Sequence, residues 1–196
     1  MRRRTLLSLV ALTGLSPALA RAEDPRLAAR AIGKPDAKAQ VGEWFSLTCT
    51  HCAAFAQETF PQVKTKLIDT GKVFYVFHDF PLDQVALTAA MVARALPPER
   101  YEPFIGALFA SQDRWAFAQG VNSTEELWKM AALAGMSRTA FDATIADTVL
   151  RDAILAHQKA DAARWSIDST PTFVINGTKH PGEMDYDTFV KLIPDA

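Results

Sequence analysis

Cys49 and Cys52 are the residues of this sequence whose type and spacing most clearly suit chemistry. They are the only cysteines among 196 residues, and two residues separate them. An apolar stretch at 41–48 precedes them and predicts a strand, and a helix-periodic run follows. A helix N-terminus lowers the pKa of a thiol there, so Cys49 is expected to be a thiolate near neutral pH. Cys52 lies one turn further along and could resolve a mixed disulfide, so the pair favours reversible disulfide exchange.

Two other uses of a cysteine pair fit less well. A structural disulfide stabilises mainly by closing a loop of the unfolded chain, and a gap of two residues closes almost nothing. A zinc site needs two further ligands, but the sequence has no second cysteine pair. The histidines outside the motif show no paired ligand spacing and are interpreted as ordinary strand, helix and hairpin residues: His78, His157 and His180. We therefore expect neither a metal nor a cofactor.

Residues 1–22 have the pattern of a secretory signal peptide. A basic start at 1–4 precedes an apolar stretch at 5–15 that is too short to span a bilayer. Small residues in A-x-A patterns then predict cleavage before Glu23. An ordinary buried helix fits the arginine cluster less well, and the arginines permit either the general secretory or the twin-arginine route. Export predicts a periplasmic location, where a lone cysteine pair is more often catalytic than structural.

The composition after cleavage indicates one globular protein with an acidic balance. Removal of 1–22 leaves 17 basic and 22 acidic residues, and this gives no basic patch of the kind that nucleic acid requires. The remaining 174 residues suit one domain, or one domain with an insertion. We expect a monomer. Only 23–40 precedes the first predicted strand, and this segment is too short for a separate dimerisation domain.

The periodicity of the mature chain switches from strand to helix and back. A polar lead-in at 23–40 precedes the first strand at 41–47, and a helix begins at Cys52, which Pro61 should kink or split. A second, nearly all-apolar run predicts a strand buried on both faces. The later elements are a strand at 72–78, helices at 83–96, 99–111, 124–134, 138–148 and 149–165, a strand at 172–175, a hairpin return at 178–180 and a helix at 186–193.

Turn and cap residues mark the ends of these elements. Asp83, Ser137 and Asp185 can cap the helices that follow them, and Ser123 with Glu126 has the spacing of a capping box. The dipeptide at 176–177 is Asn-Gly, the strongest short signal for a two-residue hairpin turn.

In this order the elements and motifs resemble the DsbA-like family of thiol–disulfide oxidoreductases. The matching pieces are 43–52 (EWFSLTCTHC), 77–82 (FHDFPL) and 170–177 (TPTFVING), and together they extend over the mature chain. The resemblance implies an α/β protein with a thioredoxin fold interrupted by a helical domain. The expected divisions are a first thioredoxin-fold part at 23–81, a helical insertion at 82–165 and a second thioredoxin-fold part at 166–196.

The resemblance also implies roles for four residues around the cysteine pair. Cys49 corresponds to the exposed nucleophile and Cys52 to the buried resolving thiol. His51 matches the histidine that helps to hold the thiolate, and a donor beside Cys49 is well placed for this. Glu43 matches a buried acidic residue that takes part in proton transfer near the resolving cysteine. From the residues alone, Glu43 could instead face outward from its strand, because a lone buried carboxylate is costly.

Two further positions complete the implied site. Thr170 and Pro171 match a cis-proline loop that faces the cysteine pair and lays the substrate backbone beside the nucleophile, although a trans turn proline is the more frequent case. Thr50 departs from the family pattern, because many oxidising members carry proline there. The dipeptide Thr50-His51 is expected to tune the reduction potential, since it affects how far the reduced thiolate is stabilised.

The leading functional hypothesis is the oxidation of exported, unfolded or partly folded proteins that contain cysteine. The resemblance implies that a membrane thiol oxidase similar to DsbB restores the disulfide form. A disulfide isomerase or reductase would use the same residues and remains an alternative. A non-catalytic module that binds copper or another metal through the thiols is a third hypothesis, which metal content and thiol titration would separate from the redox ones.

Overall fold

A five-stranded mixed sheet forms the centre of the molecule in a computed structural model that describes residues 24–194; the predicted signal peptide lies outside the described residues. The spatial order of the strands is β1-β3-β2-β4-β5. The central pair β2 and β3 is parallel, and the other neighbours are antiparallel. The strands are β1 (Arg30–Gly33), β2 (Ala39–Phe45), β3 (Val73–Asp79), β4 (Thr172–Ile175) and β5 (Thr178–Pro181).

Strand β1 corrects the prediction of a lead-in without strands at 23–40. Its four residues pair antiparallel with β3 and close that edge of the sheet. The strand is short, begins with the buried Arg30 and ends with Gly33, so it shows neither an apolar run nor a clear alternation. Gly33 has a φ of +94°, and a Cβ there would lie 2.4 Å from the Val73 carbonyl oxygen, so the chain can turn here only with glycine.

The helical segment after the cysteine pair is long but irregular. It comprises α1 (Thr50–Ala54) and α2 (Phe60–Val63), each followed by a π-helical stretch, Phe55–Thr59 and Lys64–Ile68. Pro61 lies in the first turn of α2, where its missing N–H is least costly. The helix is therefore not broken at Pro61. Instead, wider π-helical turns precede and follow α2.

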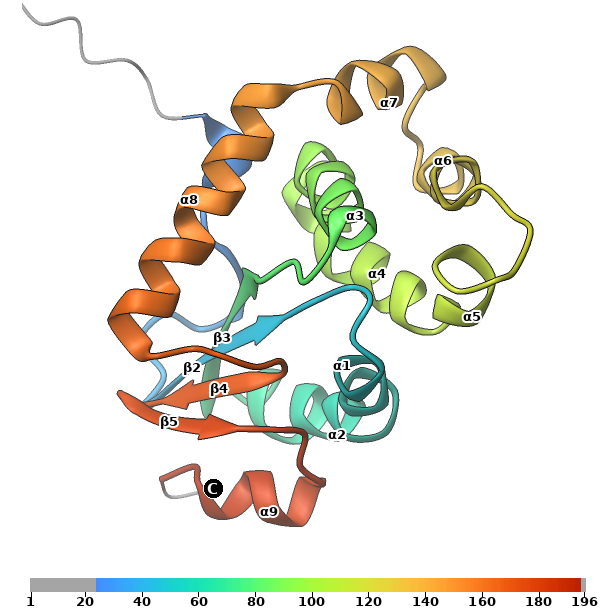
Figure 1. Ribbon diagram of the computed structural model, residues 1–196. Coiled ribbons are helices and arrows are strands. Elements are labelled where there is room, and N and C mark those ends of the chain that lie inside the picture. Colours follow the sequence, from blue (N-terminus) through green and yellow to red (C-terminus); the bar gives the residue numbers. More distant parts are fainter. Residues whose placement is uncertain (1–23, 195–196) are drawn as a thin grey trace, which may run out of the picture.

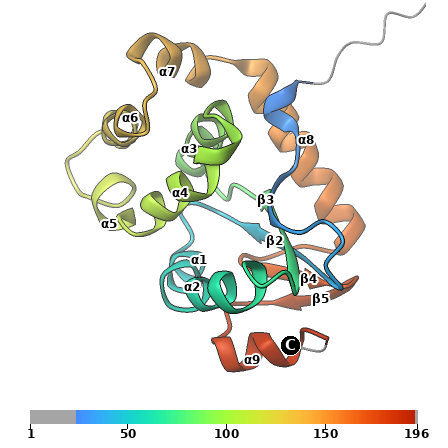
Figure 2. The same ribbon diagram turned by 180° about the vertical axis from the view of Figure 1, so that it is seen from behind.

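Six helices separate β3 from β4, and yet these two strands belong to the same sheet. Figure 1 shows most of this block beside one end of the sheet, with the long helix α8 running back along the sheet to β4, and Figure 2 shows the same arrangement from behind. The arrangement is a thioredoxin fold with an inserted helical domain, as predicted. The elements are α3 (Gln84–Ala95), α4 (Pro98–Phe109), α5 (Gln112–Trp115), α6 (Ser123–Leu133), α7 (Arg138–Ile145) and α8 (Thr148–Trp165), and α9 (Tyr186–Lys191) follows β5.

Successive side chains along β2 point to opposite faces of the sheet and therefore belong to two different hydrophobic clusters. Val41 and Phe45 belong to the main core, which also contains Phe55 and Tyr75. Trp44 points to the opposite face and packs in a smaller cluster under α8, with Phe80, Ile167 and Val174. Glu43 has the parity of Val41 and Phe45, so its carboxylate enters the main core.

Most of the predicted caps are present. The side chains of Asp83, Ser137 and Asp185 accept hydrogen bonds from the first turns of α3, α7 and α9. The capping box at Ser123 and Glu126 is wrong, because Asn122 caps α6 and Ser123 becomes its first helical residue. The hairpin turn at 176–177 is confirmed by φ values of +46° and +84°, the left-handed conformation that Asn and Gly tolerate best.

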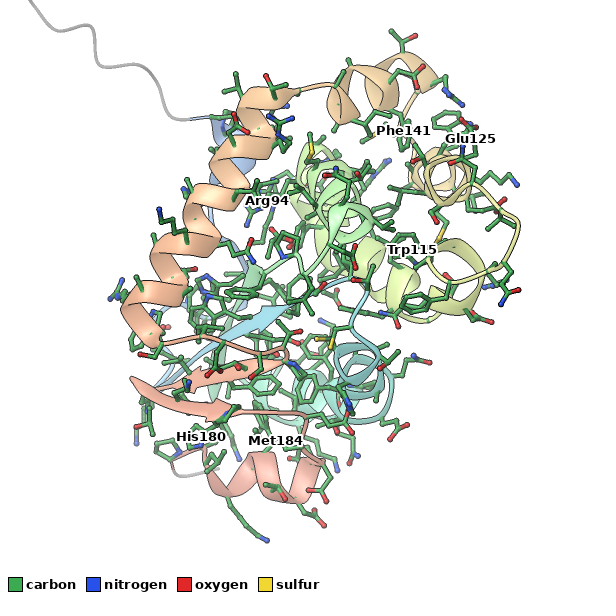
Figure 3. All side chains as sticks on the ribbon, in the orientation of Figure 1. Arg94, Trp115, Glu125, Phe141, His180 and Met184 are labelled. Atoms are coloured by element: carbon green, nitrogen blue, oxygen red, sulfur yellow. The ribbon has the colours of Figure 1, made fainter. Side chains whose placement is uncertain are left out.

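A buried ionic cluster joins the sheet to the helical block. Asp79, at the end of β3, forms an ion pair with Arg94 of α3 and accepts a 2.9 Å hydrogen bond from the Tyr101 hydroxyl of α4. Arg94 also donates to the Arg26 carbonyl oxygen at 3.0 Å, and Arg30 of β1 donates to the Arg94 carbonyl oxygen at 2.9 Å. Figure 3 labels Arg94 between α8 and the other helices. The cluster therefore connects the first two helices of the insertion, α3 and α4, to the sheet and to the N-terminal segment.

Candidate active site

Cys49 is the N-cap residue of α1, which places its sulfur at the positive end of the helix. The Cys52 backbone N–H donates to the Cys49 Sγ at 3.2 Å. The Cys52 side chain has the largest effect on the pKa of Cys49, and together with Thr170 and the backbones of Cys52 and His51 it outweighs burial and lowers this pKa to about 6. Both cysteines are free thiols in this structure. Cys49 thus has the properties expected of a nucleophile.

The loop at Thr170 and Pro171 packs directly on Cys49, as the resemblance implied. The peptide bond between these two residues is cis, and the Cys49 Sγ lies 3.3 Å from the Thr170 carbonyl oxygen. The Thr170 hydroxyl is buried and has no hydrogen-bond partner among the described residues. This loop leaves Cys49 only 8% exposed, less than the accessible position that the sequence analysis expected.

Cys52 has the opposite environment. It is fully buried, and burial is the largest of the effects that raise the pKa of its thiol, followed by the hydrogen bond with Cys49 and the negative charges of Cys49 and Glu43. The two sulfurs therefore differ strongly in acidity although two residues separate them. Such a difference directs an incoming thiolate and a leaving thiolate to different sulfurs.

Glu43 points into the protein, not outward from its strand. It is 4% exposed, and its carboxylate accepts a 2.8 Å hydrogen bond from the Tyr75 hydroxyl on the adjacent strand. Burial raises the pKa of Glu43 to about 7, against the opposing effect of the Tyr75 hydrogen bond. Glu43 also lines a cavity of about 210 Å³ between α2 and α4, whose walls include Lys64 and Glu102. A carboxyl group with this pKa can hold or release a proton near neutral pH.

Side chains of the helical insertion hold the loop before the nucleophile. The Gln112 amide donates both to the Leu47 carbonyl oxygen, at 2.8 Å, and to the Cys49 carbonyl oxygen, at 3.0 Å. The Thr48 hydroxyl donates to the Asp83 carboxylate at 2.6 Å. The sequence marks Asp83 only as a helix cap and does not mark Gln112, because no local pattern relates either side chain to a loop more than thirty residues away.

His51 is exposed on α1, and its ring pairs with a carboxylate from another element. The His51 Nδ1 atom lies 3.0 Å from a carboxylate oxygen of Glu183, in the connection between β5 and α9. No motif in the sequence marks Glu183 as a residue of this site. Thr50 is exposed as the first residue of α1.

The remaining histidines are not at this site, but His78 is more than an ordinary strand residue. Its ring stacks on Trp44 at a centroid distance of 4.1 Å, and its Nδ1 atom lies 3.1 Å from Asp161 of α8. Asp161 also accepts a 2.9 Å hydrogen bond from the Trp44 indole, so the cluster fastens α8 to the sheet. Across residues 24–194 there is no cluster of three or more side chains suited to a metal ion. Within the same residues, no helix combines the length and apolar character needed to cross a membrane.

Comparison with known proteins assigns the family. A family model described as Thioredoxin matches residues 27–195. The crystal structure of alpha-DsbA1 from Wolbachia pipientis is 34% identical and superimposes with a TM-score of 0.79, over 85% of this chain and 89% of that chain. The chain belongs to the DsbA-like branch of the thioredoxin superfamily.

Two other similarities agree with the DsbA-like assignment. The "Putative protein-disulfide oxidoreductase" of Rickettsia typhi is 30% identical over 149 residues, which are 76% of this chain and 54% of that protein. The DsbA-like chain thus spans about half the length of this curated relative. BdbD from Bacillus subtilis, at 20% identity, shares the fold with a TM-score of 0.74 over 84% of this chain and 90% of that chain.

Proposed function

We propose that this DsbA-like protein is a thiol–disulfide oxidase that introduces disulfide bonds into exported proteins. The observation that carries the proposal is the environment of Cys49, where hydrogen bonds lower the pKa to about 6. A stabilised thiolate favours the reduced enzyme, so the disulfide form becomes the better oxidant. The DsbA-like fold and the similarity to alpha-DsbA1 support the same chemistry.

In the first step, a substrate thiolate attacks Cys49 Sγ of the Cys49–Cys52 disulfide. A bond forms between the substrate sulfur and Cys49, the Cys49–Cys52 bond breaks, and its electron pair leaves on Cys52. Because Cys52 is buried and its thiol pKa is raised, the leaving sulfur takes up a proton. Glu43, whose pKa is about 7 and whose charge affects Cys52, is suited to supply that proton.

In the second step, another thiolate of the substrate attacks the substrate sulfur of the mixed disulfide. The new substrate disulfide forms, the bond to Cys49 breaks, and Cys49 leaves as the thiolate that its surroundings stabilise. The substrate has then lost two electrons and the enzyme has gained two. An external oxidant must restore the Cys49–Cys52 disulfide, and we assign this role to a membrane thiol oxidase similar to DsbB.

Substrate binding is assigned to the loop at Thr170 and Pro171. The Thr170 carbonyl oxygen lies 3.3 Å from the Cys49 Sγ, so a peptide that pairs with this loop would have its sulfur beside the nucleophile. The peptide would be an unfolded or partly folded segment, because a folded domain could not reach a sulfur that is 8% exposed. The predicted signal peptide at 1–22 and the periplasmic location belong to the same proposal, as does a monomeric state.

The equilibrium of the protein with glutathione tests the direction of exchange. Thiol counting after equilibration should give a reduction potential more oxidising than about −180 mV, the value of protein disulfide isomerase. A potential at or below that value contradicts the oxidase and favours the isomerase or reductase. Wild-type protein in the disulfide form should also oxidise a reduced test protein that has two cysteines.

Two matched variants test whether Cys49 is the nucleophile and Cys52 the resolving thiol. Cys52→Ser should form a stable mixed disulfide with a disulfide-containing peptide through Cys49, because no second thiol is left to resolve it. Cys49→Ser should form none, since Cys52 is fully buried. Peptide mapping that places the adduct on Cys52 would contradict the assignment of Cys49 as nucleophile.

A further inference from the structure

The β5–α9 connection brings one carboxylate to the edge of the cysteine pair. Glu183 lies in this connection, 132 positions along the chain from His51, and its carboxylate oxygen is 3.0 Å from the His51 Nδ1. The two side chains are 42% and 72% exposed, respectively. An exposed pair is weak when both partners are free to move, so the positions of the two backbones decide whether it persists.

The backbone on both sides of Glu183 is fastened to the site. On one side, the Gly182 N–H donates to the Pro171 carbonyl oxygen at 2.8 Å. On the other side, the buried Thr59 hydroxyl donates to the Met184 carbonyl oxygen at 2.9 Å. Figure 3 labels Met184 between β5 and α9. Glu183 is therefore fixed between the cis-proline loop and the helical segment that carries His51.

The interactions that lower the pKa of the Cys49 thiol include the His51 backbone but not the His51 ring. The ring, when protonated, carries a positive charge that would stabilise a nearby thiolate. A carboxylate at 3.0 Å largely cancels the field of that charge. The family resemblance implies that the histidine supports the thiolate. Here Glu183 pairs with that histidine and weakens this support.

The geometry points to Glu183 as a positioning residue that holds the His51 ring at the β5–α9 connection and so limits the support that the ring gives to the Cys49 thiolate. This inference rests on the proposed assignment of Cys49 as the nucleophile. In consequence, Glu183 makes the protein a milder oxidant than the same site would be if the His51 ring had no carboxylate partner. Two anchored neighbours, Gly182 and Met184, make this setting a fixed property of the fold.

Other charged or titratable groups also face this corner of the molecule. Cys52 and Glu43 lie on the inner side and interact electrostatically with Cys49. Glu58 and Asp185 line the same cavity of about 400 Å³ as Glu183. Asp83 approaches from the start of α3 through its hydrogen bond with Thr48. A useful test must therefore separate Glu183 from the general acidity of its surroundings.

The variant Glu183→Gln removes the charge but keeps the shape, and the pKa of Cys49 is followed by thiolate absorbance and by alkylation rate. We expect a decrease of roughly half a unit, since an exposed pair contributes about 0.2–1 kcal/mol and one unit corresponds to 1.36 kcal/mol. The equilibrium with glutathione at neutral pH should move about threefold toward the reduced enzyme. Because Glu183 is on the surface, the fold should be retained.

A double-mutant cycle with His51→Ala decides whether Glu183→Gln changes the pKa of Cys49 by way of the His51 ring. In the His51→Ala background, Glu183→Gln should leave the pKa of Cys49 unchanged. An equal decrease in both backgrounds would mean that Glu183 acts directly on the sulfur, and this would overturn the inference. The control is Glu58→Gln, an exposed carboxylate of the same cavity, whose lining does not include His51; it should leave the pKa of Cys49 at its wild-type value.

Failure of the inference can be told apart from failure of the proposed function. An unchanged pKa in Glu183→Gln, together with normal oxidation of the test protein by the wild type, rejects the positioning role alone. If the wild type does not oxidise the test protein while the cycle behaves as expected, the oxidase proposal fails and the role of Glu183 stands. A decrease in Glu58→Gln as large as in Glu183→Gln also rejects the inference.

Discussion

Because its folded-state pKa is lowered to about 6, Cys49 makes the stability of the reduced protein depend on pH. The unfolded thiol has the higher pKa, so the contribution is fully present above about pH 9 and is lost as pH falls through 6. A shift of this size corresponds to about 4 kcal/mol. Urea unfolding of the reduced protein should therefore show stability rising between about pH 6 and 9, and Cys49→Ala should lack this rise. An equal rise in the variant would assign it to other groups.

Glu43 makes stability depend on pH in the opposite direction. Its pKa is raised from 4.5 to about 7 in the folded state, so the unfolded chain loses its proton first as pH rises. Stability should fall between about pH 4.5 and 7, by about 3 kcal/mol in all. Glu43→Gln should abolish this fall when unfolding is measured on the disulfide form, in which the cysteines do not titrate. A wild-type stability that is flat in this window would contradict a buried, protonated Glu43.

At the scale of elements, the start of α3 serves both a helix and the active-site loop. Asp83 accepts a 2.8 Å hydrogen bond from the Ala86 N–H as the N-cap and a 2.6 Å hydrogen bond from the Thr48 hydroxyl. Asp83→Ala should lower the free energy of unfolding by about 1 kcal/mol, the usual cost of a lost cap. It should also change the alkylation rate of Cys49, because the loop that carries Thr48 loses a partner.

Ser137→Ala is the matched control for this prediction. Ser137 caps α7 through a 3.2 Å hydrogen bond from the Ala140 N–H and lies in an exposed part of the helical block. A similar loss of stability is expected, but the alkylation rate of Cys49 should not change. If both variants alter the rate equally, the link between Asp83 and the loop has no consequence for the thiol.

Elements with strong local signals could be predicted from the sequence, and elements that depend on distant partners could not. The apolar run of β3, the turn at 176–177 and the cap at Asp185 each depend on residues within one segment. By contrast, β1 is defined by its pairing with β3, and its four residues carry no pattern of their own. The same distinction applies at the site, where Cys49 and Pro171 lie in recognisable motifs but Gln112 and Glu183 do not.

At the scale of the whole molecule, the ionic cluster around Asp79 should contribute strongly to the attachment of the helical insertion. Asp79 is the carboxylate that faces both Arg94 and Arg30, and all three side chains are buried. Asp79→Asn keeps the shape but leaves the two guanidinium groups without this counter-charge. The free energy of unfolding should fall by about 3–5 kcal/mol in urea unfolding, the cost of an uncompensated buried charge.

A second variant separates charge from packing in this cluster. Asp79→Asn combined with Arg94→Met removes one of the two buried positive charges and keeps an apolar side chain of similar length. It should be more stable than Asp79→Asn alone, because breaking a buried pair costs more than replacing it. A double variant that is less stable than Asp79→Asn would show that Arg94 contributes mainly through its hydrogen bonds to the N-terminal segment.

The amide of Gln112 binds two carbonyl oxygens of the loop before Cys49. The reactivity of the Cys49 thiol should therefore depend on local opening of helix α5, which carries Gln112. Helix α5 has only four residues, and short elements of this kind exchange their amide hydrogens through local fluctuations, not through global unfolding. Each time α5 opens, the loop is released although the sheet remains intact. The labelling rate of Cys49 in weak denaturant should therefore follow the opening free energy of α5, measured by hydrogen exchange, and not that of the central strands.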